Sequence, residues 1–243
     1  GNPNQEVTAI LAGLDPTSRL IDEAIALGAN TVITHHPVIF KPLPAINTSH
    51  PEGRLLEKAL SNRIAIIGCH TNYDSASIGV SAILAEQLGL YTHRPLVPTS
   101  PEKLPGIGLG RIGNYPVAIA SSEFLQRVLH VLQRESVQMA GPLPEKILTV
   151  AICGGSGSDL APQARSLGAQ VYLSAEIKHS MAVWAIESEF CIIDGTHYAT
   201  EKPAVGFLVK QLEQICQKEN WSIRILETTT EHHPFVTKDR SHQ

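Results

Sequence analysis

The feature that most constrains the fold is a segment that occurs twice, 140 residues apart (167 − 27), with Leu27-Gly28-Ala29 matching Leu167-Gly168-Ala169. In each copy an apolar run, a glycine-containing turn and a helix-like stretch precede these three residues, and a second apolar run follows them. Short apolar runs rich in β-branched residues predict buried strands, and glycine after a helix predicts its C-terminal cap. Each copy therefore predicts a β-α-β unit, with strand, helix and strand at 7–12, 18–27 and 31–34, and again at 147–153, 159–167 and 171–174.

A third correspondence extends the repeat, because residues 66–70 resemble residues 193–197 and both follow a helix-like stretch. We therefore predict an α/β fold with two pseudo-duplicated halves, about 1–100 and 101–243, whose mixed sheets pack around a central metal cleft. A connector rich in proline and glycine joins the halves as loop and edge strand and is too short for an inserted middle domain. Further expected elements are helices at 121–133, capped by Ser121 or Ser122, and at 201–218, and a last strand at 222–226.

Composition excludes several classes of protein. Hydrophobic residues make up 43% of the 243 residues, enough for a core, whereas the net charge of −4 and the lack of a basic run argue against nucleic-acid binding. No stretch approaches the roughly 20 apolar residues of a membrane helix, and no signal peptide is visible, so we expect a cytoplasmic protein. The four cysteines form no CxxC pair, which is typical of buried thiols in a reducing compartment. Because the chain opens at Gly1, almost directly before an apolar run, we expect a preceding segment to be missing.

Candidate metal ligands follow three of the predicted strands. His35 and His36 follow the run 31–34, Asp74 closes a polar stretch after the run 64–67, and His197 and Glu201 follow the run 191–194. In open α/β sheets, ligands bind at the carboxyl ends of strands. These ends offer three imidazoles and two carboxylates, a set that suits two divalent ions, and Zn, Fe, Mn, Co and Ni all remain open.

The pair His197 and Glu201 and the His35-His36 motif also have plainer interpretations. His197 and Glu201 lie four residues apart and share one helical face, but such pairs also occur on solvated helix surfaces. Neighbouring residues point in different directions, so His35 and His36 would each serve a different ion. The same His-His-Pro tripeptide recurs at 232–234 in a polar tail that we interpret as a solvated terminus. Asp74 and Glu201 would offset the charge of the ions, with Glu201 bridging them.

Two further features are ambiguous. The stretch 154–159, Gly-Gly-Ser-Gly-Ser-Asp, is either a phosphate cradle at a helix N-terminus or a tight turn that needs a positive φ. Glu176 and His179 follow a strand end in the second half, where they are either proton-transfer groups or a salt-bridged glutamate and an exposed histidine.

These motifs together resemble the NGG-interacting-factor-3-like family, whose bacterial members are named GTP cyclohydrolase 1 type 2 homologues. The resemblance spans nearly the whole chain and is specific only as a combination. In family order the matching motifs are Thr34-His35-His36-Pro37, His70-Thr71-Asn72-Tyr73-Asp74, Cys153-Gly154-Gly155-Ser156-Gly157, Leu173-Ser174-Ala175-Glu176 and Asp194-Gly195-Thr196-His197-Tyr198-Ala199-Thr200-Glu201. Two motifs depart from the pattern: Ser174-Ala175 stands where Thr-Gly is common, and Thr196 separates Gly195 from His197.

The resemblance implies a dinuclear site with ligands His35, His36, Asp74, His197 and Glu201, of which Glu201 bridges, inside a toroidal homohexamer. It also implies a hydrolase of the GTP cyclohydrolase 1 type 2 kind, in which activated hydroxide attacks purine C8 and formate leaves, while Glu176 or His179 moves protons. Two alternatives remain: a metal-dependent phosphoesterase or amidohydrolase, and a non-catalytic metal-binding or regulatory ring. Five protein ligands for two ions leave coordination positions open, which favours catalysis.

Overall fold

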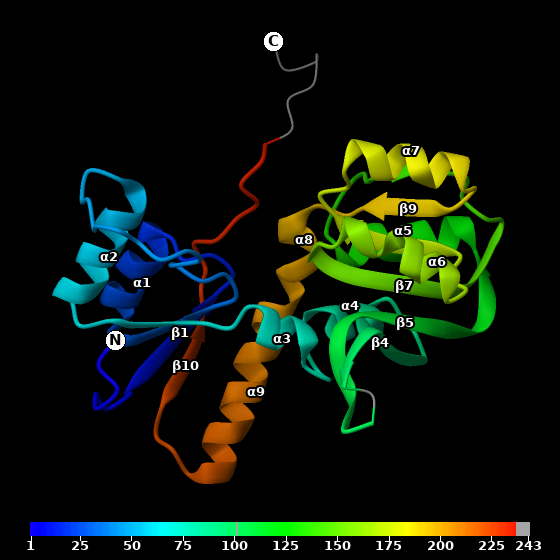
Figure 1. The fold of residues 1–243 in the computed structure, drawn as a ribbon. Coiled ribbons are helices and arrows are strands. Elements are labelled where there is room, and N and C mark those ends of the chain that lie inside the picture. The colour runs from blue at the N-terminus through cyan, green and yellow to red at the C-terminus, as the bar shows by residue number, and fades with distance from the viewer. Residues whose placement is uncertain (101, 237–243) are drawn as a thin grey trace. The chain divides into compact units, whose positions relative to one another are not determined.

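The computed structural model describes residues 1–100 and 102–236, and its chain divides into two compact units (Figure 1). One unit combines residues 1–70 with the C-terminal part of the chain from Leu208, and the other comprises residues 71–207. These bounds differ from a division near residue 100, because the last strand returns to the sheet of the N-terminal strands. The long helix α9 (Pro203–Glu219) begins in the second unit and ends in the first.

The first unit is built on a four-stranded sheet in the order β10-β1-β2-β3, in which every neighbouring pair is parallel. Its strands are β1 (Ala9–Gly13), β2 (Thr31–Thr34), β3 (Ala65–Gly68) and β10 (Arg224–Glu227). Helices α1 (Ser18–Leu27) and α2 (Pro51–Ser61) lie side by side and pack their apolar faces on Leu11 and Val32. All residues of β1 and β2 are buried, as expected for a parallel sheet.

The second unit holds a mixed sheet of six strands in the order β4-β5-β7-β8-β9-β6. The pairs β7–β8 and β8–β9 are parallel and the others antiparallel. Helices α4 and α5 cover one face, and α6 and α7 cover the other. The elements are α3 (Thr71–Ser75), α4 (Val80–Gln87), β4 (Thr92–Ser100), β5 (Leu104–Ala120), α5 (Ser121–Val131), β6 (Gln138–Ala140), β7 (Lys146–Ser156), η1 (Ser158–Leu160), α6 (Ala161–Ser166), β8 (Val171–Ala175), α7 (His179–Glu187), β9 (Cys191–Asp194) and α8 (His197–Glu201).

The predicted α/β class and its repeated unit are confirmed. Strands β1 and β2 are connected through α1 and pair in parallel, and β7 and β8 are connected through α6 and pair in the same way. The next strand of each sheet is β3 beside β2 and β9 beside β8. Gly28 and Gly168 both follow the helix of their copy with positive φ, at 67° and 89°. The duplicated Leu-Gly-Ala sequence therefore marks the same helix end in both units.

Several local expectations were wrong. The cap of α5 is Ala120, and neither predicted serine caps this helix. The connector is a long antiparallel hairpin, in which only β4 is an edge strand and β5 lies inside the sheet. The helix expected at 201–218 is present as α9, which begins two residues later, at Pro203, where proline has no N–H to donate to the preceding turn. Among the described helices, none is both long and apolar enough to cross a membrane.

Candidate metal centre

Three histidines gather at the carboxyl edge of the first sheet. His35 and His36 follow the end of β2, and His70 comes two residues after the end of the neighbouring strand β3. The ring centroids of His35 and His36 are 5.0 Å apart. The ring centroid of His70 lies 5.2 Å from that of His35 and 5.6 Å from that of His36. One ring nitrogen from each lies within 4.8 Å of the other two, close enough to share an ion. The strand-end argument anticipated His35 and His36, but it gave His70 no place among the ligands.

Hydrogen bonds at Nδ1 turn two of these rings toward metal binding. His35 Nδ1 lies 2.9 Å from the Cys69 carbonyl oxygen, and His36 Nδ1 lies 2.8 Å from Asp15 Oδ1. A carbonyl oxygen only accepts, so Nδ1 of His35 carries the proton and Nε2 carries the lone pair. An ionised Asp15 imposes the same tautomer on His36. Metal-binding histidines commonly make this kind of bond with the nitrogen that does not face the ion.

Asp15 is a functional candidate that our sequence reasoning missed. It lies in the turn between β1 and α1, two residues after the end of β1. Because β1 and β2 are parallel neighbours, their carboxyl ends meet at the same edge as the histidines. The signal was therefore available: an acidic residue directly after the strand that pairs with the histidine-bearing strand.

A second cluster lies at the strand ends of the other unit, around His197. This residue begins α8, just after β9, and its Nδ1 lies 3.1 Å from Glu176 Oε1, while its Nε2 lies 3.1 Å from Glu201 Oε2. The hydrogen bond to Glu201 and the charges of Glu201 and Glu176 raise the pKa of His197, although burial acts against them. An oxygen of Asp74, from α3, lies within 4.8 Å of one from Glu201. Glu176 and Glu201 thus flank a single imidazole, and Asp74 lies beside Glu201.

The backbone that presents His197 is strained. Thr196 has φ = 66° and ψ = 145°, a conformation that a β-branched residue rarely adopts. Asp194 holds this turn, since its two carboxylate oxygens accept hydrogen bonds of 2.9 Å from the amides of Thr196 and Ile177. Glu176, beside Ile177, also has a positive φ of 52°. One aspartate therefore fixes both segments that place Glu176 against His197.

The glycine-rich stretch after Cys153 begins as the irregular end of β7, where the pairing register with β8 shifts, and its three glycine amides are already hydrogen-bonded within the protein. The amides of Gly154, Gly155 and Gly157 donate to the hydroxyls of Ser81, Thr200 and Ser174, at 3.0 to 3.1 Å. Gly155 has φ = 67°, and a Cβ on it would lie 2.1 Å from Glu201 Oε1. The expected positive φ is present at Gly155, but within the end of β7 and not in a separate turn, and the missing side chain leaves room for Glu201.

A buried arginine supports the segment that carries Asp74. Arg111, on β5, is 1% exposed, and burial lowers the pKa of its guanidinium. Its Nη1 donates to the carbonyls of Gly108 and Gly110, and its Nη2 donates to Ala76 O at 2.6 Å and Gly106 O at 3.3 Å. Ala76 comes directly after α3, so the guanidinium ties the Asp74 helix to the hairpin.

Comparison with known proteins places the chain. The family model described as Duf34/NIF3 (NGG1p interacting factor 3) matches residues 1–234. The chain belongs to the Duf34/NIF3 family. Relatives named GTP cyclohydrolase 1 type 2 homolog include one from Streptomyces coelicolor, 32% identical over 97% of this chain and 84% of its own length. Another, from a Nostoc species, is 33% identical over 86% of this chain and 79% of its own.

Solved structures of the Duf34/NIF3 family share this fold. A Bacillus cereus protein related to NIF3 superimposes with a TM-score of 0.89 at 25% identity, covering 98% of this chain and 91% of that one. A Staphylococcus aureus hypothetical protein gives the same TM-score at 27% identity, covering 98% and 90%. The resemblance inferred from the motifs is thereby confirmed at the level of family and fold.

Two further histidines lie outside the two clusters of this Duf34/NIF3 chain: His179, predicted as a proton-transfer group, and His232, interpreted as part of a solvated terminus. His179 is exposed at the first position of α7. His232 is exposed in the C-terminal segment, where its Nδ1 lies 3.2 Å from Thr230 O. Among the described residues, neither belongs to a group of side chains spaced to hold an ion.

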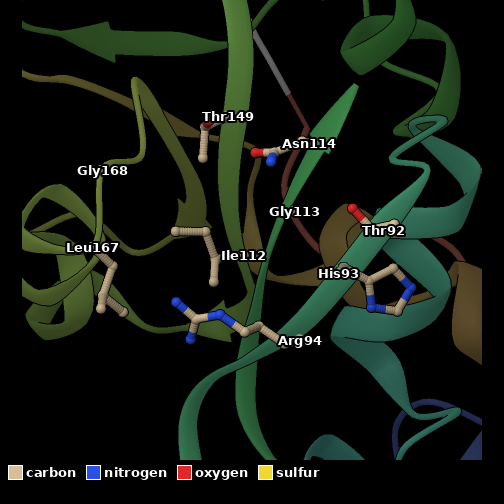
Figure 2. A pocket seen from close by; sticks show the side chains of 9 residues that line it. All are labelled: Thr92, His93, Arg94, Ile112, Gly113, Asn114, Thr149, Leu167 and Gly168. Carbon is tan, nitrogen blue, oxygen red and sulfur yellow. The ribbon is translucent and has the colours of Figure 1, made fainter. Parts of the chain in front are cut away.

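A hollow of about 470 Å³ lies in the second unit, bordered by β4, β5, Thr149 of β7 and the two residues after α6 (Figure 2). The Arg94 guanidinium extends toward Ile112 and Leu167, and the neighbouring His93 ring points the other way, as residues do along a strand. None of the predicted ligands lines this hollow. The clusters at the strand ends therefore remain the better candidates for the functional site.

Proposed function

We propose that this protein is a hydrolase that uses two divalent metal ions. In this proposal the two clusters serve one centre, with His35, His36, Asp74, His197 and Glu201 as ligands and Glu201 bridging the ions. The observation that carries it is the pair of hydrogen bonds from Nδ1 of His35 and His36 to Cys69 O and Asp15. With the proton on Nδ1, the lone pair of each Nε2 is available to a metal ion.

The residues fit such ions by their chemistry. Imidazole nitrogens with carboxylate oxygens suit Zn, Fe, Mn, Co or Ni. The carboxylates of Asp74 and Glu201 lie close enough to repel each other, and a cation between them would relieve that repulsion. When bound, the ions would supply Lewis-acid activation of water and stabilise negative charge in the transition state.

The chain's own groups have separate tasks in this proposal. Asp15 and the Cys69 carbonyl hold His36 and His35 in the binding tautomer. Glu176 holds His197 from its Nδ1 side and, being exposed, is placed to exchange protons with solvent. His179, exposed on α7, is the second candidate for proton transfer. A Glu176→Gln variant that loses activity while retaining its metal would support this assignment.

The substrate we propose is GTP, because relatives covering most of this chain are named GTP cyclohydrolase 1 type 2 homologs. Hydrolysis at purine C8 would open the five-membered ring and release that carbon as formate. We also propose a ring of six copies, which a solution mass tests, and a cytoplasmic location. The four cysteines, all among the described residues, form no disulfide, which supports a reducing compartment.

The test is release of formate from GTP by purified protein loaded in turn with Zn, Mn, Fe, Co and Ni. The proposal expects formate from wild type with at least one metal, and none from His36→Ala. Exposed Glu57 on α2 offers a control, since Glu57→Ala should retain full turnover. Turnover of phosphodiesters or amides without formate would retain the metals but replace the substrate. No turnover by any metal-loaded form would leave a metal-binding scaffold.

A further inference from the structure

The C-terminal segment after β10 makes specific contacts with the turn that carries Asp15. Oε1 of Glu231 accepts hydrogen bonds from the backbone amides of Leu14 and Asp15, each 2.8 Å long, across more than 200 residues of sequence. One carboxylate oxygen thus fixes two consecutive peptide groups. The expectation of a solvated terminus holds for exposed His232 but not for Glu231.

A second glutamate fastens the same segment. Glu23, on α1, accepts from the hydroxyls of Thr228, Thr229 and Thr230 and, at 2.9 Å, from the amide of Thr229. Burial opposes ionisation of Glu23, but the hydrogen bonds from these threonines outweigh it and lower the pKa to about 2. The Thr228 amide also donates to Ala12 O at 2.9 Å. Glu231 is therefore held beside the β1–α1 turn by several independent bonds.

The turn that Glu231 fixes is joined to His36 twice. Leu14 O accepts the backbone amide of His36 at 2.9 Å, and Asp15 Oδ1 lies 2.8 Å from its Nδ1. The fit is close, because a Cβ on Gly13 would lie 3.3 Å from Glu231 Oε1. A displacement of the turn would move Asp15 and release the imidazole from its fixed tautomer.

We propose that Glu231 is a positioning residue for His36, acting through the Leu14–Asp15 turn to keep Nε2 of His36 available to a metal ion. The effect on metal binding rests on the proposed function, whereas the effect on the His36 ring does not. In chemical terms, a carboxylate from the end of the chain completes the orientation of an imidazole near its beginning.

The first experiment reads the tautomer without metal. Long-range ¹H–¹⁵N spectra of the metal-free full-length protein would compare wild type, Glu231→Ala, Glu231→Gln and the control Glu57→Ala. We expect His36 to be protonated at Nδ1 in wild type and in the control, and mixed in Glu231→Ala. Glu231→Gln retains an oxygen that can accept both amides, so it should recover most of the wild-type signal. An unchanged His36 signal in Glu231→Ala would overturn the proposal.

The second experiment measures Zn²⁺ affinity by competition with a chromophoric chelator. Loss of an orienting partner typically weakens metal binding about 10- to 100-fold, and we expect that range for Glu231→Ala. Asp15→Ala should weaken binding similarly, and the double variant no further, because both act through one bond to His36. If the losses of Zn²⁺ affinity in the two single variants add up in the double variant, Glu231 does not act through the bond between Asp15 and His36. If wild type binds no Zn²⁺, the proposed function fails. The metal-free spectra of His36 would then still show whether Glu231 fixes its tautomer. If Glu231→Ala does not fold, Glu231→Gln and Asp15→Ala carry both tests.

Discussion

The strands β1, β2 and β3 and the strands β7, β8 and β9 have the same order and direction, yet their carboxyl ends carry different groups. After β2 the chain places His35 and His36, and the matching positions of the second copy are Ala175, the last residue of β8, and Glu176. The third strand of each set leads to a histidine, His70 or His197. The repeated fold thus fixes where functional side chains emerge, while the residues at those positions decide their charge.

The two regions also orient their histidines by different means. In the first unit, the Cys69 carbonyl and Asp15 hold the Nδ1 atoms of His35 and His36. In the second, His197 lies between two carboxylates, on a strained turn beside a glycine that leaves room for Glu201. The first cluster should therefore respond mainly to changes in hydrogen-bond partners, and the second to changes in the backbone.

The largest effect should come from removing the buried cation of the second region. Arg111→Met leaves carbonyl oxygens of the hairpin and of Ala76 without their donors, so we expect about 3 kcal/mol of lost stability. Urea unfolding would measure it, with the exposed Arg94→Met as control. Arg111→Lys should recover only part, because an ammonium group cannot reach all of these carbonyls. Equal stability of wild type and Arg111→Met would refute the supporting role of Arg111.

A glycine pair separates steric from conformational effects. Gly155→Ala and Gly168→Ala both force a side chain into positive φ, at 67° and 89°, but nothing lies within 4 Å of a Cβ at Gly168. We expect about 1 kcal/mol of destabilisation at Gly168 and about 2 kcal/mol at Gly155. Only Gly155→Ala should displace Glu201 and weaken Zn²⁺ binding. Equal Zn²⁺ affinities of the two variants would show that Gly155 does not protect Glu201.

Relief of strain should act in the opposite direction. Thr196→Gly removes a β-branched residue from φ = 66°, and we expect the free energy of unfolding to rise by about 1 kcal/mol. The freed turn should hold His197 less firmly, so Zn²⁺ affinity should fall. Thermal unfolding and a chelator competition would measure the two quantities. A Thr196→Gly variant that is less stable than wild type would show that this turn stores no strain.

The smallest effect should be the loss of stability in acid that comes from Glu23 in the first unit. Because folding lowers the pKa of Glu23 from 4.5 to about 2, its stabilising contribution is complete above pH 4.5 and disappears as the pH falls toward 2. Wild type should therefore exceed Glu23→Gln in unfolding free energy at pH 6, and the difference should shrink steadily below pH 4.5. Urea unfolding at several pH values measures it, and a difference independent of pH would contradict the assigned ionisation.

Residues close to strand ends were predictable from sequence, and their distant supports were not. Apolar runs and the repeated Leu-Gly-Ala sequence located the parallel strands, and strand ends in turn located His35, His36 and Glu176. Glu231 and Arg111 gave no local signal, because their roles depend on the chain returning to β1 and on burial inside a hairpin. The prediction that Ser121 or Ser122 caps α5 was wrong as well. Serine near the start of a helix is a common pattern, and here the cap position is one residue earlier, at Ala120.

The central claim is that the two histidine- and carboxylate-bearing clusters serve one pair of ions. Anomalous diffraction from crystals of the zinc-loaded protein would test it most directly. The account predicts two zinc ions per chain, with Glu201 between them and His35, His36, Asp74 and His197 completing their protein ligands. A single zinc held by His35, His36 and His70 alone, or ions bound by only one of the two clusters, would contradict it.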